Sequence, residues 1–353
     1  MTAGSSQVQY RVTIRQAGRE VAVASDETIL AAALAAGVAY PFGCQSGNCA
    51  ACKSRLLRGD VDLLPHNDYA LTEAERTQGL ILACRAVPRS DAAVAWLELD
   101  ETIQHPLRQL DCAVTEVVAA THDITVVRLR IARGGPFDFR PGQYAAVRFA
   151  GQPDRDFSMA TPPAGEVIEF HVRAVADGTV SRFVATSLRP GDRVGVTGPM
   201  GFAFLRDSHR GPIIAVAGGS GLAPMKAIVE AALAQGLAQP IHLYFGARTQ
   251  RDLYLVEHFQ ALAHRHDNLR YDVVLSEAGD PAPFRGGFLH DALAADYADL
   301  DGAKLYVAGP PPMVDAVAAS GRRLGVRVED IHADPFYAAH ELPRAGSGSV
   351  SGT

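Results

Sequence analysis

Four cysteines in the first quarter of the chain constrain its fold more than any other feature. Cys44, Cys49 and Cys52 lie within nine residues of one another, and Cys84 follows thirty-two residues later. Three thiols this close in sequence converge on one point only if the loop between them turns sharply. Gly47 gives that loop backbone freedom, because glycine adopts dihedral angles closed to other residues. The spacing therefore predicts a compact loop folded around a shared centre.

The same spacing predicts the chemistry of that centre. A Cys-x4-Cys-x2-Cys run with a distant fourth cysteine is the plant-type ferredoxin pattern for a [2Fe–2S] cluster. We therefore expect the metal ligands to be Cys44, Cys49, Cys52 and Cys84. Two alternatives stay open: four buried structural cysteines, or a zinc site, although zinc usually takes two close cysteine pairs and Cys84 stands alone. Cys112 lies outside the pattern and is expected to be a small buried hydrophobe.

Composition and charge exclude several classes of function. The 353 residues predict two or three domains, and 48% hydrophobic with 20% charged residues is typical of a globular protein. The net charge of −6 argues against a nucleic-acid binder and against a polybasic membrane patch. No signal-peptide pattern opens the chain, and an odd number of cysteines argues against a disulfide framework. We expect a cytoplasmic monomer that binds neither nucleic acid nor membrane.

The first of the predicted domains, residues 1–100, is β-rich. It is expected to contain two strands, a helix and a closing strand, at residues 8–14, 21–24, 29–36 and 94–99. The helix is expected to begin after a Ser25 or Asp26 cap and to stop at Gly37. Residues 101–110 lose this periodicity and are predicted to be a linker.

Two further domains are predicted after the linker. Residues 111–206 are rich in Val, Ile and Phe and carry regular turn signals, which predicts an antiparallel β-barrel. In residues 207–340 apolar strands alternate with helices, which predicts an α/β domain with a doubly wound parallel sheet. Its elements are expected at residues 213–217, 225–234, 241–245, 255–264, 271–275 and 304–308. Residues 341–353, ending in a Gly- and Ser-rich stretch, are predicted to be a disordered tail.

The predicted barrel carries residues suited to a flavin dinucleotide. Such a cofactor needs cations or helix N–H groups at its pyrophosphate and hydrogen bonds at the polar edge of its ring. Arg155 offers a cation, Ser158 offers a hydroxyl near the flavin N5, and residues 178–181 form a turn at the start of a helix. The alternative is that Arg155 and Arg173 are exposed strand residues in cross-strand pairs.

A second nucleotide site is predicted in the α/β domain. Strand residues 213–217 run directly into a glycine-rich turn, residues 218–221, which a helix follows. Glycines let a backbone approach a pyrophosphate, and the helix N-terminus favours its charge. No Gly-Lys-Ser/Thr follows, which excludes a Walker loop, and Pro224 stands near the place of the third Rossmann glycine. The alternative is a plain tight connection, but residues 246–248 and 309–313, at the ends of later strands, support nucleotide binding.

Taken together, these patterns resemble the oxygenase-reductase branch of the ferredoxin–NADP reductase superfamily, most of all the NADH-dependent reductases of aromatic-ring dioxygenases. The resemblance covers residues 8 to about 338. It implies an α+β ferredoxin-like β-grasp domain with a [2Fe–2S] cluster, an antiparallel β-barrel with FAD, and an α/β domain for NADH. For FAD it implies Arg155, Phe157, Ser158, His171, Val172, Arg173, Gly178, Thr179 and Ser181; for NADH it implies Gly219, Ser220, Gly221, Pro224, Arg248, Gly309 and Pro310.

The resemblance also implies two catalytic residues, Ser158 and Phe336. Phe336 matches an aromatic residue that covers the flavin face in relatives, and the alternative is a hydrophobic C-terminal plug. Three residues depart from the family pattern: Phe157 stands where many members have Tyr, Ala308 where many have Cys, and Ala50 where Gly is common. The first change removes a hydroxyl from the flavin pocket, the second is expected to position the nicotinamide less tightly, and the third to alter hydrogen bonding around the cluster.

The activity implied is that of an NADH:ferredoxin or oxygenase oxidoreductase. Electrons pass from NADH to FAD, then to the cluster, and on to a Rieske ferredoxin or directly to the terminal component of a dioxygenase. One alternative feeds a di-iron monooxygenase; another, from a different class, is a redox sensor without NADH turnover. NADH is expected rather than NADPH, although Arg248 and Arg251 leave a contact with a 2′-phosphate open. Basic residues near the cluster ligands suit an acidic partner or form an ordinary solvated surface: Lys53, Arg55, Arg58, Arg85 and Arg89.

Overall fold

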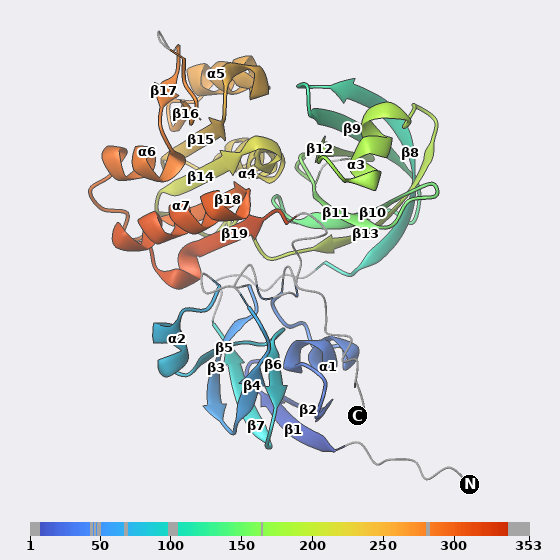
Figure 1. Cartoon of the computed structure of the whole chain (residues 1–353), viewed down its shortest axis with the longest axis vertical. Helices are drawn as coiled ribbons and strands as arrows, with labels where there is room; N and C mark the ends of the chain where they lie inside the picture. Colours follow the sequence, from blue (N-terminus) through green and yellow to red (C-terminus); the bar gives the residue numbers. More distant parts are fainter. Residues whose placement is uncertain are drawn as a thin grey trace, which may run out of the picture. The chain divides into compact units, whose positions relative to one another are not determined.

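The computed structural model describes residues 8–42, 45, 47, 51–66, 70–97, 105–163, 165–279 and 283–337 (Figure 1). The chain divides into two compact units, of which the first takes most of the chain up to Trp96 and the second takes Leu97–Phe336 together with residues 41–43. Within the described residues no helix is long and apolar enough to cross a membrane. The tail predicted at residues 341–353 lies outside the described part.

The first unit is built on a five-stranded sheet with the order β2-β1-β7-β3-β5. Its strands are β1 (Gln9–Ile14), β2 (Arg19–Ala24), β3 (Lys53–Arg58), β5 (Leu80–Leu82) and β7 (Ala92–Trp96). The pair β1 and β7 is parallel, and the other pairs are antiparallel. A separate pair joins β4 (Val61–Leu63) to β6 (Ala86–Pro88), and the helices are α1 (Ile29–Ala35) and α2 (Glu73–Thr77). The predicted hairpin is confirmed, with Gly18 in its turn at φ +58°.

The predicted range of helix α1, residues 29–36, is confirmed to within one residue, but its predicted N-cap is wrong by two or three residues. Thr28 is the N-cap, and its side chain accepts a hydrogen bond from the Ala31 N–H at 3.3 Å. Ser25 and Asp26 cannot take this role because they belong to the turn that leaves β2, in which the Glu27 N–H bonds the Ala24 carbonyl. The predicted stop at Gly37 is confirmed, since this glycine has φ +71° just after the helix.

The second unit begins with a six-stranded antiparallel sheet of order β11-β10-β13-β8-β9-β12, which curls into the barrel seen in Figure 1. Its strands are β8 (Arg108–Ala119), β9 (Ile124–Arg133), β10 (Tyr144–Phe149), β11 (Arg155–Ser158), β12 (Val167–Arg173) and β13 (Arg193–Met200). Helix α3 (Thr179–Thr186) begins at the predicted turn, with Gly178 as its N-cap. Strand β8 starts within the segment expected to be a linker. Phe149, Phe170 and Val127 are among the side chains that fill the barrel.

The rest of the second unit is the predicted doubly wound domain. Its parallel sheet has the order β17-β16-β15-β14-β18-β19, formed by β14 (Ile213–Gly218), β15 (Ile241–Ala247), β16 (Leu269–Leu275), β17 (Arg285–Gly286), β18 (Lys304–Gly309) and β19 (Ile331–Pro335). Helices α4 (Leu222–Ala234) and α5 (Val256–Arg265) cover one face, and α6 (Leu289–Asp296) and α7 (Pro311–Arg323) cover the other (Figure 1). The strand order reverses between β14 and β18, the place where open α/β sheets bind ligands.

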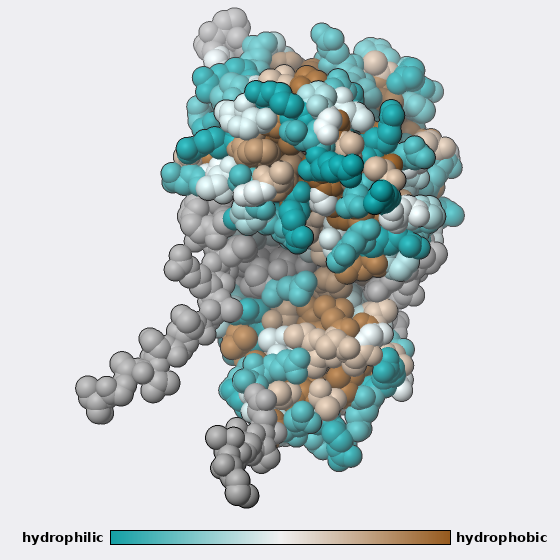
Figure 2. All heavy atoms as spheres, turned by 90° about the vertical axis from the view of Figure 1, so that its right-hand side faces the viewer, coloured by the Kyte–Doolittle hydropathy of each residue, from teal (hydrophilic) through white to brown (hydrophobic). Residues whose placement is uncertain are grey.

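Most large apolar side chains of the described residues are buried. Figure 2 shows one face on which hydrophilic residues are interspersed with small apolar patches. Exposed large apolar side chains in the described part of the chain include Leu57, Leu64 and Phe288.

Candidate functional site

Two of the four predicted metal ligands lie side by side in the first unit. Cys52 precedes β3 and Cys84 follows β5; each is only 3% exposed, and neither forms a disulfide. The Cys84 N–H points at the Cys52 sulfur, with a nitrogen–sulfur distance of 3.5 Å. Buried, adjacent cysteines, one of whose sulfurs accepts a backbone N–H, suit an iron–sulfur cluster. Cys44 and Cys49 lie outside the described residues.

The surroundings of these thiols are apolar and tightly folded. Strand β5 and the following Ala83 are buried next to Cys84. Gly47 has φ +81°, and a Cβ at this position would lie 2.8 Å from both Arg85 Cγ and His66 Cβ. The loop therefore needs glycine here both for its backbone conformation and for its close contact with the segment that carries Cys84.

A buried hydrogen-bond chain, which the sequence reasoning missed, ends on the backbone of Cys52. Tyr40 and Ser54 are fully buried, and their hydroxyl oxygens lie 2.6 Å apart. The Ser54 hydroxyl donates to the Cys52 carbonyl at 3.0 Å. Because a hydroxyl has one proton and a carbonyl can only accept, Tyr40 donates to Ser54 and Ser54 donates to Cys52. Burial raises the pKa of Tyr40, so its phenol keeps the proton that this chain requires.

The structure corrects one expectation about the basic residues near the cysteines. Lys53 is buried, and its ammonium forms an ion pair with Glu75 at 2.8 Å. Alternation along β3 turns the Lys53 side chain towards α2 and away from solvent. Lys53 therefore belongs to the interior of this unit and cannot dock a partner. Burial alone would raise the pKa of Glu75, but hydrogen bonds from Lys53 and Thr72 hold it below its ordinary value.

In the second unit, residues predicted to bind the flavin lie opposite the part of the α/β domain predicted to bind the nicotinamide. Ser158, at the end of β11, donates to the Asp334 carboxylate of β19 at 2.9 Å. Arg173, at the end of β12, pairs with Asp123 at 2.8 Å. A Cβ added at Gly219 would lie 3.2 Å from the Arg173 guanidinium. The barrel strands β11 and β12 thus meet the carboxyl ends of β14 and β19 at one seam, and this seam is the candidate site.

His171 occupies the centre of a buried polar network at this seam. Its Nε2 lies 3.1 Å from the Glu169 carboxylate, and its Nδ1 lies 2.9 Å from the Tyr254 hydroxyl. Lys226 of α4 pairs with Glu169 at 3.5 Å. Both ring nitrogens of His171 are therefore engaged by protein groups. Glu169 and Tyr254 were not predicted, although alternation along β12 places residues 169 and 171 on one face.

Charges around Glu169 keep this buried carboxyl ionised. Burial would raise its pKa, but the hydrogen bond from His171 and the nearby Lys226 and Arg128 charges lower it to about 2. His171 is buried and its pKa lies below the ordinary value, because burial outweighs the attraction of Glu169. At neutral pH the network therefore contains a neutral imidazole beside a carboxylate.

The glycine turn after β14 approaches other backbone closely. A Cβ at Gly221 would lie 2.1 Å from the Ala308 carbonyl oxygen, and Gly309 adopts φ +143° beside Gly218. Gly221 is therefore needed for packing against β18, in addition to any approach to a pyrophosphate. Among the described residues no side chain caps the first turn of α3, which leaves N–H groups there for an anionic phosphate. Helix α7 offers no such donors, because Pro311 and Pro312 have no N–H and the Met313 N–H bonds the Pro310 carbonyl.

Other predicted residues lie in loops, at the starts of helices and on the surface. The Phe336 N–H donates to the Gly309 carbonyl at 2.9 Å, and its ring packs against the core of the α/β domain. Pro310 is the N-cap of α7, and Pro224 lies inside α4. Thr179 and Ser181 lie in the first turn of α3, where the Ser181 hydroxyl donates to the Gly178 carbonyl at 3.3 Å. Arg155 and Arg248 are exposed.

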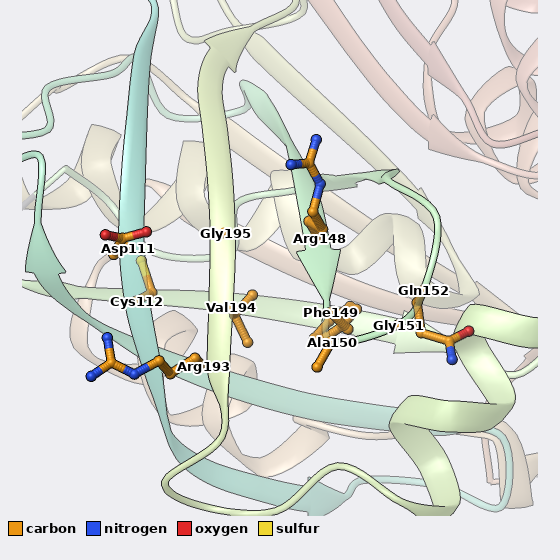
Figure 3. Close-up of a pocket in the computed structure, with 10 residues that line it drawn as sticks. All are labelled: Asp111, Cys112, Arg148, Phe149, Ala150, Gly151, Gln152, Arg193, Val194 and Gly195. Atoms are coloured by element: carbon orange, nitrogen blue, oxygen red, sulfur yellow. The ribbon is translucent and has the colours of Figure 1, made fainter.

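The fifth cysteine behaves as predicted. Cys112 is buried in the barrel, and burial raises the pKa of its thiol to about 12, so it stays a neutral apolar group. It borders an open pocket of about 210 Å³ whose lining also includes Phe149 and Val194. In Figure 3 the guanidinium groups of Arg148 and Arg193 point away from Val194. The pocket contains none of the predicted cofactor residues.

Comparisons with known proteins agree with this geometry. The family of 2Fe-2S iron-sulfur cluster binding domains matches residues 12–89, oxidoreductase FAD-binding domains match residues 111–204, and oxidoreductase NAD-binding domains match residues 215–319. These matches identify a [2Fe–2S] cluster, FAD and NAD as the cofactors and exclude the zinc alternative.

Relatives match the chain over nearly its whole length. The ferredoxin–NAD(P)+ reductase component of naphthalene 1,2-dioxygenase/salicylate 5-hydroxylase systems from Ralstonia sp is 40% identical over 85% of this chain and 90% of its own. The reductase component of phenol 2-monooxygenase from Pseudomonas sp. (strain CF600) is 37% identical over 98% of both chains. The crystal structure of an Amycolatopsis cytochrome P450 reductase is 35% identical, with a TM-score of 0.73 over 93% of this chain and 98% of that one. The chain therefore belongs to the oxygenase reductases of the ferredoxin–NADP reductase superfamily, electron-transfer enzymes that join a [2Fe–2S] ferredoxin domain to FAD- and NAD-binding domains.

Proposed function

We propose that this chain supplies electrons from NADH to the oxygenase of an aromatic-ring dioxygenase system, directly or through a Rieske ferredoxin. The observation that carries the proposal is the seam in the second unit, where the residues for the flavin and those for the nicotinamide face one another at strand ends. FAD accepts a two-electron hydride and returns electrons one at a time, which is the chemistry needed between NADH and a one-electron cluster. The 40% identity to a dioxygenase reductase component supports this recipient.

The proposal assigns each cofactor to specific residues. Cys44, Cys49, Cys52 and Cys84 hold the cluster, and Ser158 with Phe336 lies at the hydride-transfer site. The flavin is held by Arg155, Phe157, Ser158, His171, Val172, Arg173, Gly178, Thr179 and Ser181, with His171 contributing its backbone. The dinucleotide is held by Gly219, Ser220, Gly221, Pro224, Arg248, Gly309 and Pro310. Support comes from the uncapped first turn of α3 and from the adjacent thiols of Cys52 and Cys84.

NADH is expected to be preferred over NADPH by at least about tenfold in kcat/KM, the equivalent of roughly 1.4 kcal/mol. The guanidinium of Arg251, one of two arginines near the ribose loop, already donates to His122 at 3.0 Å. The buried Asp252 carboxylate beside it disfavours another negative group. Steady-state kinetics with both dinucleotides measure this preference, and a higher kcat/KM for NADPH contradicts it.

The chain from Tyr40 through Ser54 to Cys52 is expected to raise the reduction potential of the cluster. A hydroxyl dipole aimed at the Cys52 carbonyl offsets the negative charge that the cluster gains on reduction. Ser54→Ala should therefore shift the midpoint potential to more negative values by roughly 10–40 mV, since one hydrogen bond is worth about 1 kcal/mol and 59 mV is a tenfold change for one electron. A redox titration followed by EPR measures the shift. Ser90→Ala, which removes a half-buried turn hydroxyl of the same unit, is the control, and an unchanged potential in Ser54→Ala contradicts the assignment.

A second recipient is supported by one observation. The reductase component of phenol 2-monooxygenase matches 98% of both chains, more of this chain than the dioxygenase reductase does. Reconstitution decides between them: the purified chain is mixed with a Rieske dioxygenase, with and without its ferredoxin, or with a di-iron hydroxylase. NADH oxidation coupled to product formation is expected with the dioxygenase system. If NADH oxidation is coupled to product formation only with the di-iron hydroxylase, that hydroxylase and not the dioxygenase is the electron recipient.

A further inference from the structure

We infer that Tyr254 is a positioning residue for hydride transfer, because it hydrogen-bonds flavin strand β12 and packs against the glycine turn of the dinucleotide site. Its hydroxyl lies 2.9 Å from His171 Nδ1 and 3.5 Å from the Gly219 carbonyl oxygen. His171 belongs to the barrel, and Gly219 belongs to the turn after β14. One side chain thus contacts a segment assigned to each cofactor. This inference rests on the proposed use of NADH.

The Tyr254 ring is buried and packs against two other rings. The residue is 6% exposed, and its ring makes edge contacts with His171 at 5.3 Å and with Phe245 at 5.7 Å between ring centres. The next residue, Leu255, has φ +57°, a left-handed conformation that is unfavourable for a branched side chain. Strain of this kind persists only where the surroundings over-determine it, and it clusters at functional sites. The turn into α5 therefore places Tyr254 at the cost of an unfavourable backbone angle.

The proton of Tyr254 has a defined destination. Glu169 is ionised and can only accept, so His171 Nε2 carries a proton and donates to it. A neutral His171 then has an unprotonated Nδ1, which accepts from the Tyr254 hydroxyl. Glu169 is fixed in turn by Lys226 of α4 and Arg128 of β9. A continuous buried hydrogen-bond chain therefore runs from the barrel through Glu169 and His171 to Tyr254, whose oxygen packs 3.5 Å from the Gly219 carbonyl oxygen.

Such a chain matters because hydride transfer depends steeply on the distance and angle between donor and acceptor. A displacement of about 1 Å by a remote change can slow a reaction by about 10²-fold. Tyr254 contacts neither of the reacting groups in this account. Its removal is therefore expected to change the rate of transfer more than the affinity for NADH.

The test is Tyr254→Phe in the full-length protein loaded with FAD and cluster. Anaerobic stopped-flow measurement of flavin bleaching by NADH gives the limiting rate and the apparent Kd. The limiting rate is expected to fall roughly tenfold, with a larger primary isotope effect from NADH deuterated at C4, while the Kd changes by less than about threefold. Equilibrium binding of NAD+ to the oxidised protein gives a readout that is independent of turnover and is expected to stay near the wild-type value.

Tyr271→Phe is the matched control. Tyr271 lies in β16 of the same domain, its ring packs on Phe259, and its buried hydroxyl has no hydrogen-bond partner in the described part of the chain. The flavin of the Tyr271→Phe variant should be reduced by NADH at the wild-type rate. A wild-type limiting rate in Tyr254→Phe, or equal slowing in both variants, overturns the inference. Failure of NADH to bleach the flavin of the wild-type protein would instead overturn the proposed function.

Discussion

Replacing Cys84 by serine is expected to lower the rate of NADH-dependent cytochrome c reduction by about 10²-fold or more, while NADH–ferricyanide activity stays close to that of the wild-type protein. Cys84 is buried beside Cys52, and its own N–H points at the Cys52 sulfur. Serine removes one of four thiolate ligands and leaves that backbone arrangement unchanged. Ferricyanide takes electrons from the flavin directly, so its reduction reports on the second unit without the cluster.

The control for this variant is Cys112→Ser. Cys112 is equally buried, but it lies in the barrel and outside the ligand set. It is expected to keep the iron content and cytochrome c activity of the wild-type protein. Loss of both activities in Cys84→Ser would contradict the electron order from flavin to cluster. If Cys84→Ser keeps both activities, Cys84 is not a ligand of the cluster.

Replacing Glu75 by alanine is expected to destabilise the ferredoxin unit by about 3–5 kcal/mol, the usual effect of breaking a buried ion pair. The side chains of Lys53 and Glu75 are 3% and 12% exposed. The change takes away the carboxylate that faces a buried ammonium, and it also removes half of the capping box that Glu75 forms with Thr72 at the start of α2. Urea unfolding followed through the cluster's visible circular dichroism measures the loss.

The matched control is Glu73→Gln in the same helix. Glu73 pairs with Arg76 at 2.7 Å, but both side chains are exposed, and such pairs contribute less than about 0.5 kcal/mol. Equal destabilisation by Glu75→Ala and Glu73→Gln would contradict the special role of the buried pair.

Glu75 also makes the stability of this unit depend on pH. The folded pKa of Glu75 lies below the ordinary value of 4.5, so the contribution of Glu75 to stability is complete above pH 4.5 and is lost as the pH falls through the folded value.

Local patterns predicted the fold well because they report on nearby residues. The glycine turn after β14 and the alternation of strands with helices each concern a short segment, and each appears where expected. The cap of α1 was placed wrongly because Ser25, Asp26 and Thr28 are all good caps, and the exit from β2 decides between them.

Contacts between distant segments were beyond the reach of those patterns. Lys53 looks like a surface residue until Glu75, which is 22 residues away, is folded against it. His171 fits a flavin motif, but its partner Tyr254 follows 83 residues later, on another domain of the same unit. Only packing brings such groups together, and a buried polar side chain has to find a partner wherever the fold provides one.

The central claim is that electrons reach the cluster from NADH only through the flavin. Anaerobic titration of the full protein with NADH, followed by optical absorbance and by EPR, tests it most directly. The flavin should bleach and the signal of the reduced [2Fe–2S] cluster should appear in the same sample, whereas protein stripped of FAD should show no cluster signal. A bleached flavin with a cluster that stays oxidised, or a cluster reduced by NADH without FAD, would contradict the account.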